Sequence, residues 1–140
     1  MKSKTTRFIL DKLQKSLMFS GSKLGSSLIL KEVLRKILKK KKNPLNLIFS
    51  GVDQVKPFFL VKTQKKGKKK KVQIPVPLLT EESRLKISSN WIVNNSSKHS
   101  QNFVSERLIQ ELVDSSTNQG FSKKQQQDLN KLVIQNRSSL

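Results

Sequence analysis

The chain has 140 residues, with 29 Lys and Arg against nine Asp and Glu, one His and no Cys, and its formal net charge is +20. One domain is expected at this length, and the lack of cysteine excludes a disulfide scaffold, a thiolate zinc site and a cysteine nucleophile. The composition therefore favours a polyanionic partner over catalysis or metal chemistry.

The charge is concentrated in the first half of the chain. Residues 1–71 hold 21 of the 29 basic residues and three acids, a net +18, whereas residues 72–140 hold the other eight and six acids, a net +2. Two lysine-rich runs, 39–42 and 65–71, lie between apolar segments and not at a terminus. A small domain needs a net charge of only about 2–8 to stay in solution, so nucleic acid is the favoured partner.

Apolar residues at helical spacing predict three helices, over about residues 6–18, 23–41 and 44–55. The third has the clearest start, because Asn43 can cap the free N–H groups and Pro44 fits the first helical position. The residues expected to face the core are Ile9, Leu13, Leu17, Leu30, Leu34, Ile37, Leu38, Leu45, Ile48, Val52 and Val55.

The apolar period then changes from helical to two over residues 58–77. The residues favour strands at 58–63 and 71–76, joined by a polar connection at 64–70 centred on Gly67. We predict a two-stranded β-ribbon with a basic tip, in which Pro75 and Pro77 make the second strand an edge. Because isolated ribbons are marginal in water, its base should pack on helices or it should lie along a ligand.

Three further helices are predicted, over about residues 80–97, 102–116 and 122–137. Thr80 should cap the first, Gly120 suits a left-handed stop, and Ser122 with Gln125 forms a capping-box pattern. The residues expected to face the core are Ile87, Trp91, Ile92, Val104, Leu108, Leu112, Leu129, Leu132 and Val133. The predicted fold is mainly α: a six-helix single domain with a protruding two-stranded antiparallel β-ribbon between helices three and four.

No residue set indicates catalysis. His99 follows Lys98 in a polar turn, which favours a capping or exposed role over metal binding, and Glu106 and Glu111 beside Arg107 suggest an ion-pair set on a helix surface. Trp91 could stack on an RNA base, but its spacing favours core packing. We expect no catalytic residue, cofactor, metal or small-molecule substrate.

Several strings, in order, resemble a ribosomal family. They are Asn43-Pro44-Leu45, Val55-Lys56-Pro57, Gln73-Ile74-Pro75-Val76, Trp91-Ile92-Val93, Glu106-Arg107-Leu108 and Glu111-Leu112, then Asp114, Gly120, Lys124, Asp128, Lys131 and Asn136-Arg137. With the basic ribbon between helices three and four, the chain resembles the seventh small-subunit ribosomal protein over nearly its whole length, most weakly before residue 43.

The resemblance implies a single rRNA-binding domain over residues 1–140 that binds the 3′ major (head) domain of small-subunit rRNA. Such proteins nucleate head assembly, contact other head proteins and lie near the exit-site tRNA and mRNA path. Together with the charge distribution, this predicts rRNA contacts at Lys2, Lys4, Arg7, Lys23, Lys31, Arg35, Lys36, Lys39, Lys40, Lys41 and Lys42. Ribbon contacts to rRNA or tRNA are predicted at Lys62, Lys65, Lys66, Gly67, Lys68, Lys69, Lys70 and Lys71.

The chain also departs from that family. The basic N-terminal tail shrinks to residues 1–7, and Asn90 replaces an Arg that commonly precedes the Trp. The composition also bears on the compartment. Lys-, Asn- and Ser-rich usage suggests an AT-rich organellar genome and a mitochondrial ribosome, with plastid or bacterial cytoplasm as alternatives. Residues 1–23 could also serve as a transit peptide.

Two other functions stay open. A general nucleic-acid-compacting protein would share the charge and the ribbon, and a cationic membrane-surface protein would share the basic second helix. Glu32 on that helix counts against the latter. No uncharged run of about 18 residues is present, so no membrane span is expected.

Overall fold

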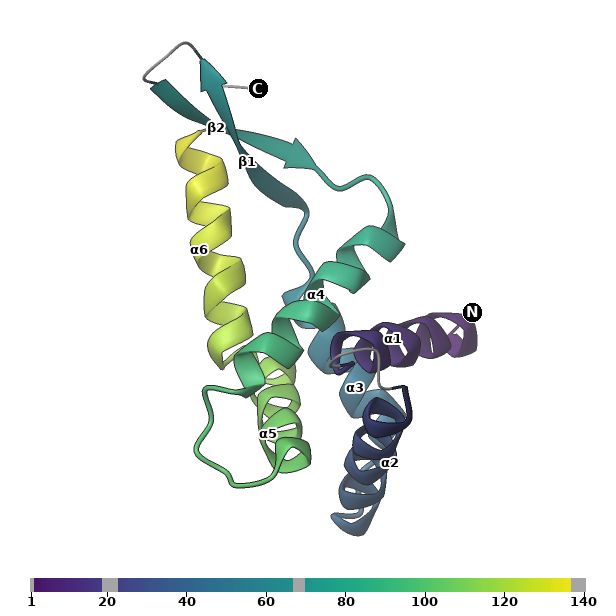
Figure 1. The fold of residues 1–140 in the computed structure, drawn as a ribbon. Helices are drawn as coiled ribbons and strands as arrows, with labels where there is room; N and C mark the ends of the chain where they lie inside the picture. Colours follow the sequence, from purple (N-terminus) through teal and green to yellow (C-terminus); the bar gives the residue numbers. More distant parts are fainter. Residues whose placement is uncertain (1, 19–22, 67–69, 137–140) are drawn as a thin grey trace.

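The computed structural model describes residues 2–18, 23–66 and 70–136, and within these segments the chain forms six helices and a two-stranded antiparallel sheet (Figure 1). The ribbon lies between the third and fourth helices, so the predicted fold class is confirmed. The elements are α1 Lys2–Ser16, α2 Lys23–Lys39, α3 Pro44–Val55, β1 Phe59–Lys66, β2 Lys70–Pro77, α4 Glu81–Ser96, α5 Val104–Ser116 and α6 Phe121–Gln135.

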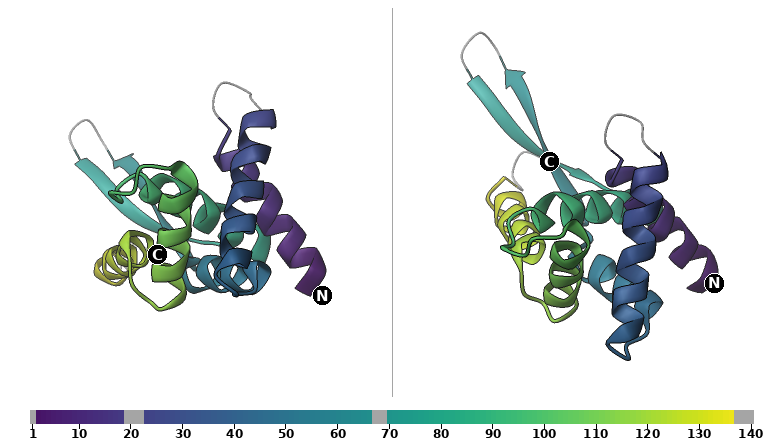
Figure 2. Two further views of the ribbon diagram at one scale, coloured as in Figure 1. Left: turned by 90° about the horizontal axis from the view of Figure 1, so that it is seen from below. Right: turned by 60° about the horizontal axis from the view of Figure 1, so that its bottom comes forward.

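Helices α1 to α5 form a body around one apolar core. The predicted stripe of α1 is confirmed, because Ile9, Leu13 and Leu17 are all buried. The other buried apolar side chains in the core are Val33, Ile37, Ile48, Val52, Val55, Leu85, Ile92, Val93, Leu108, Ile109 and Leu112. Figure 2 shows α6 at the edge of this body, on the side opposite to the N-terminus of α1.

On α2, α3 and α5, three residues predicted to face the core do not. On α2, Val33 is buried and Leu38 is 60% exposed, because the buried face runs through positions 26, 30, 33 and 37. Leu45 and Val104 are exposed, since each lies in the first turn of its helix, beyond the edge of the core.

The helix starts at α3 and α4 are formed as predicted. The Asn43 side-chain oxygen accepts from the backbone N–H groups of Leu45 at 3.1 Å and Asn46 at 3.3 Å, and Thr80 Oγ1 accepts from Ser83 N at 3.2 Å. Helix α3 then passes close to α5: a Cβ at Gly51 would lie 3.0 Å from the carbonyl oxygen of Leu112. A glycine is thus needed where these helices meet.

The ribbon strands are longer than predicted. Pairing runs from Phe59 opposite Pro77 to Lys66 opposite Lys70, so the expected connection over residues 64–70 is wrong at both ends. The sequence suggested an early turn because residues 64–70 are polar and centred on Gly67. Like charges directly opposite each other destabilise a sheet. In the structure the register nevertheless places Lys65 opposite Lys71.

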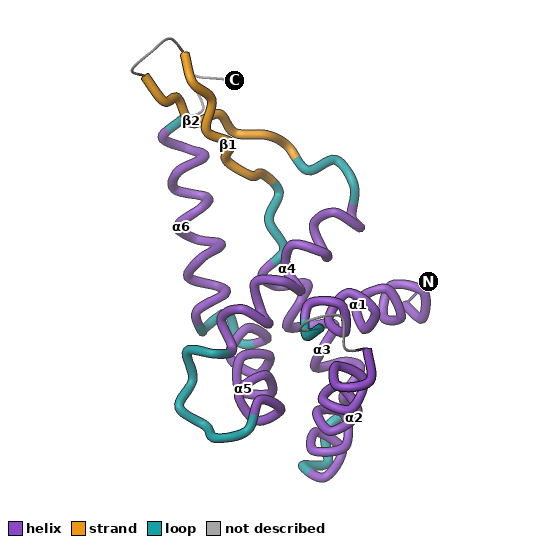
Figure 3. The backbone as a smooth tube through the Cα atoms, in the orientation of Figure 1, coloured by secondary structure: helices purple, strands orange, loops and turns teal. Residues whose placement is uncertain are grey.

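Helix α6 leaves the body and reaches the base of the ribbon, where it lies beside β1 (Figure 3). Its buried residues are Ser122 and Gln126, whereas Leu129 and Val133 are half-buried and Leu132 is 37% exposed. The prediction that this stripe faces the main core is therefore wrong, because none of its three residues belongs to that core.

Candidate nucleic-acid interface

The C-terminal end of α2 and the turn after it form a basic surface, the α2 end. Lys39 to Lys42 are all exposed, and Lys41 adopts a left-handed backbone with φ 58°. Lys23, Lys31 and Arg35 are exposed along the same helix. The predicted residues of α2 therefore present their charges to solvent, with one exception.

The exception is Lys36, whose side chain is 24% exposed. Its Nζ donates to Ser105 Oγ at 2.9 Å, lies 3.7 Å from a Glu106 oxygen and stands 5.0 Å from the centroid of the Phe103 ring. These contacts fasten α2 to α5. Lys36 therefore has a structural role, unlike its exposed neighbours.

Sequence reasoning missed a second basic surface, the α1–α4 groove. Lys12, Lys15 and Lys86 line a cavity of about 460 Å³ with Ile87 and Asn90. The lysines flank the apolar stripes of two helices that pack together, which is the signal that could have predicted them. Asn90 lines this groove, so the basic residue that the resemblance led us to expect would have added to it.

The N-terminal half of α1 continues this surface. Lys4 and Arg7 are exposed there, as predicted. The side chain of Lys2 lies outside the described residues, although its backbone begins the helix.

The ribbon supplies the third basic surface. Lys62 on β1 is exposed. Lys65, Lys66, Lys70 and Lys71 occupy paired strand positions, and their side chains lie outside the described set. Gly67, Lys68 and Lys69 lie outside the described residues altogether.

The base of the ribbon is fixed by polar contacts. Lys56 Nζ lies 2.9 Å from an Asp53 oxygen and 2.6 Å from a Glu81 oxygen, joining α3 to α4. The Arg84 guanidinium stands 4.8 Å from the Phe58 ring centroid, and its Nε donates to the Leu78 carbonyl at 3.3 Å. The ribbon therefore leaves the body in a defined direction.

Burial acts to lower the pKa of Lys56, but hydrogen bonds to Glu81 and Asp53 and the attraction of both carboxylates outweigh it, so its pKa is raised. On α2, the hydrogen bond from Arg35 holds the pKa of Glu32 below its ordinary value, and attraction from Lys36 and Lys39 adds to that effect. Glu32, Asp53 and Glu81 are thus engaged by Arg35 and Lys56 within the protein, and they leave the exposed lysines to an outside partner.

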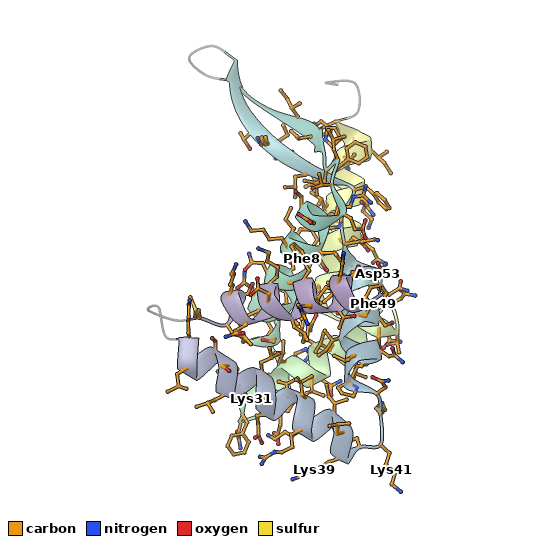
Figure 4. All side chains as sticks on the ribbon, turned by 90° about the vertical axis from the view of Figure 1, so that its right-hand side faces the viewer. Phe8, Lys31, Lys39, Lys41, Phe49 and Asp53 are labelled. Carbon is orange, nitrogen blue, oxygen red and sulfur yellow. The ribbon has the colours of Figure 1, made fainter. Side chains whose placement is uncertain are left out.

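The three basic surfaces are far apart. Figure 4 shows α1 across the middle of the molecule, the ribbon above it, and Lys39 and Lys41 of the α2 end below. A single small ligand cannot reach all of them. An extended or folded polyanion can.

A buried polar cluster lies behind the start of α6, and it overturns three predictions: an exposed or capping His99, a surface Glu111, and a capping box at Ser122 and Gln125. Glu111 is fully buried, and its Oε2 lies 2.6 Å from Nε2 of His99, whose side chain is only slightly exposed. Glu111 Oε1 accepts from Ser122 N at 2.9 Å. Helix α6 therefore begins at Phe121, with Glu111 serving its N-terminus in place of the predicted capping box.

His99, Glu111 and Asp114 could offer one ligand atom each to a metal, all within 4.8 Å of one another. Both oxygens of Glu111 already accept hydrogen bonds, and Asp114 accepts from Gln110 at 2.9 Å. A Cβ at Gly120, where φ is 92°, would lie 2.9 Å from the Asp114 Cβ. The cluster is tightly packed and internally satisfied, and we interpret it as structural.

Among the described residues, no helix is both long and apolar enough to cross a membrane.

The family model and the relatives that this chain matches all belong to one ribosomal family. The family model described as Ribosomal protein S7p/S5e matches residues 1–137. A small ribosomal subunit protein uS7 of Pelagibacter ubique is 28% identical over 131 residues, which covers 93% of this chain and 83% of that protein. Proteins of the same name from Cereibacter sphaeroides and Carsonella ruddii are 29% identical over 131 residues and 37% identical over 97 residues, with 83% and 61% of their lengths covered.

Proposed function

Because the chain belongs to the ribosomal protein S7p/S5e family and is a structural protein of the small ribosomal subunit, we propose that it binds the 3′ major (head) domain of small-subunit rRNA. In this role it nucleates head assembly and contacts other head proteins. The ribbon lies near the exit-site tRNA and mRNA path, which it contacts transiently.

The observation that carries this proposal is the separation of the basic surfaces on a rigid body. The α2 end and the ribbon lie at opposite ends of the molecule, with α1 between them (Figure 4), and Lys12 and Lys15 of α1 line the α1–α4 groove. A ligand that touches all three surfaces must therefore extend across the molecule. A folded rRNA domain offers phosphates from several helices at once.

The physical mechanism is neutralisation of phosphates with release of their counterions. If the protein neutralises about eight phosphates, its affinity for the RNA should fall by roughly three to five decades as the salt concentration rises from low to physiological. Lysine outnumbers arginine here, and lysine acts as a hydrated point charge without the fork that reads base edges. We therefore propose recognition of the RNA backbone and its shape.

The proposed body contacts are Lys2, Lys4, Arg7, Lys12, Lys15, Lys23, Lys31, Arg35, Lys39, Lys40, Lys41, Lys42 and Lys86. The proposed ribbon contacts, to rRNA or tRNA, are Lys62, Lys65, Lys66, Gly67, Lys68, Lys69, Lys70 and Lys71. The paired lysines of the ribbon support this assignment, because a polyanion along the strands relieves the repulsion between Lys65 and Lys71.

A competition experiment tests the function. The full chain is bound to a labelled 3′ major-domain transcript, and unlabelled transcript or duplex DNA of equal length is added. We expect the rRNA to compete far better. Equal competition by DNA would indicate a general nucleic-acid-compacting protein, and flotation with anionic liposomes in the absence of RNA would indicate a membrane-surface protein.

We propose a compartment from composition. The Lys-, Asn- and Ser-rich chain supports a mitochondrial ribosome in an AT-rich organelle, and the bacterial relatives make bacterial cytoplasm the main alternative. Cell fractionation tests this directly. The chain should co-sediment with small subunits of the organelle at moderate salt and be released at high salt.

A further inference from the structure

A pocket of about 600 Å³ lies between α4 and α6, in the range typical of ligand sites. Two aromatic side chains line this α4–α6 pocket, Trp91 and Phe121, together with Lys98, Lys124 and Asp128. Trp91 is half-buried, so the prediction that it packs into the core holds only in part. One part of the ring system remains open to the pocket.

Phe121 does not pack into the hydrophobic core. It is the first residue of α6 and is 38% exposed. Its ring nevertheless has a defined position, because it packs edge to face with the His99 ring, with 5.1 Å between the ring centroids and 61° between the ring planes. His99 is itself held by the buried Glu111. The buried polar cluster thus orients an exposed aromatic ring.

Basic and amide groups surround the two rings. Lys98 Nζ stands 5.4 Å from the centroid of the Phe121 ring, and Lys124 lies one turn along α6. Asn94 and Gln125 line the same pocket and carry both donors and acceptors. Aromatic faces with neighbouring cations and amides are the groups that bind an unstacked RNA base and its phosphate.

A second basic site, the groove between α2 and α5, is comparable in size but differs in its lining. It has a volume of about 530 Å³ and is lined by Lys39, Lys40 and Lys42 over Ile37 and Ile109, but by no aromatic residue among the described ones. Such a groove attracts phosphates and offers no stacking surface. Of these two sites, only the α4–α6 pocket combines charge with aromatic rings.

We propose that the α4–α6 pocket holds one unpaired RNA base between Trp91 and Phe121, with the adjoining phosphate on Lys98 and Lys124. This inference rests on the RNA-binding function proposed above and adds a stacking site to contacts that are otherwise electrostatic.

Binding at this site can be followed by the intrinsic fluorescence of the protein. It contains one Trp and no Tyr, so its intrinsic fluorescence excited at 295 nm comes from Trp91 alone. The probes are hexaadenylate RNA and an abasic strand of the same length, which keeps the phosphates and lacks the bases. We expect hexaadenylate to quench Trp91 at low salt and the abasic strand to bind without quenching.

A matched pair of variants tests Phe121. Phe103 is also an exposed phenylalanine, 64% accessible, and also has a lysine Nζ about 5 Å from its ring centroid, but it lies outside the pocket. Phe121→Leu should weaken binding of the 3′ major-domain transcript by roughly 5- to 150-fold, the range for loss of one base–aromatic stack. It should leave the salt slope unchanged, and Phe103→Leu should change neither quantity. Thermal unfolding of both variants checks that the fold is retained.

The outcomes separate the two proposals. If the transcript does not bind the wild-type chain, the proposed function itself fails. If the transcript binds and Trp91 emission does not respond to it or to hexaadenylate, or if the abasic strand quenches equally, the stacking site is wrong. A response only to added small-subunit proteins would overturn it in favour of a protein segment in the pocket.

Discussion

The helical body and the arm formed by the ribbon and α6 are held by different interactions. The body buries apolar side chains from all five of its helices. By contrast, α6 buries only Ser122 and Gln126 among its described residues. The arm joins the body through polar contacts, such as Gln126 Nε2 to the Lys56 carbonyl at 2.8 Å and Lys123 Nζ to the Gln54 carbonyl at 3.0 Å.

This difference separates stability from binding. Apolar burial is the dominant favourable term in folding, so the free energy of unfolding should depend mainly on the body. The ribbon strands, by contrast, contribute no residue to that core, and the described ribbon lysine, Lys62, is exposed. Variants of the two parts should therefore change different measurable quantities.

The largest loss of stability is expected in the body. Leu108 is fully buried on α5, and Leu108→Ala should lower the free energy of unfolding by about 2–5 kcal/mol through a cavity. Urea denaturation measures this. Leu132→Ala on α6, where the side chain is 37% exposed, is the matched control and should cost less than about 1 kcal/mol. Equal losses for the two variants would contradict the division into body and arm.

The junction between body and arm should come next. Glu111→Ala leaves Ser122 N and His99 without their buried partner and should cost about 1–3 kcal/mol. Glu111→Gln keeps an acceptor for Ser122 N and should cost less. The same denaturation series distinguishes them, and no difference between Ala and Gln would mean that the cluster does not hold α6.

Local signals predicted the parts of the fold that depend on neighbours in sequence. The caps at Asn43 and Thr80 and the stripe of α1 follow from side-chain chemistry and helical spacing alone. Leu129, Leu132 and Val133 have helical spacing, yet none of them lies in the main core as predicted. Periodicity shows that a face is covered and does not say by which element.

The candidate site was predictable only where charge is dense in sequence. The lysine runs at 39–42 and 65–71 are visible at once, whereas Lys12 and Lys86 meet only because α1 packs on α4. Glu111 was misinterpreted for the same reason. A carboxylate beside Arg107 has the pattern of a surface ion pair, and it is buried because the start of α6 arrives there from another part of the chain.

The ribbon should affect binding and leave folding almost unchanged. Replacing Lys65, Lys66, Lys68 and Lys69 with Gln should flatten the salt dependence of rRNA binding by about one unit of slope for each phosphate that the ribbon no longer neutralises. The free energy of unfolding should stay within about 0.5 kcal/mol. Filter binding at several salt concentrations measures the slope. The matched Lys→Arg set, which keeps the charge, should restore it, and loss of folding with an unaltered slope would contradict the ribbon assignment.

The smallest effect is expected at the base of the ribbon, where Lys56 contacts Asp53 and Glu81, and this effect depends on pH. The pKa of Lys56 is raised in the folded protein, so protonation favours folding. The contribution is therefore complete below the ordinary lysine pKa of about 10.4 and is lost as pH rises through the higher folded value. Solvent screening limits it to about 1 kcal/mol or less. Urea denaturation at pH 8 and pH 11.5 should show that Lys56→Met loses less stability than the wild type on going to alkaline pH. An equal loss in both proteins would mean that the Asp53–Lys56–Glu81 contact does not help to hold the arm.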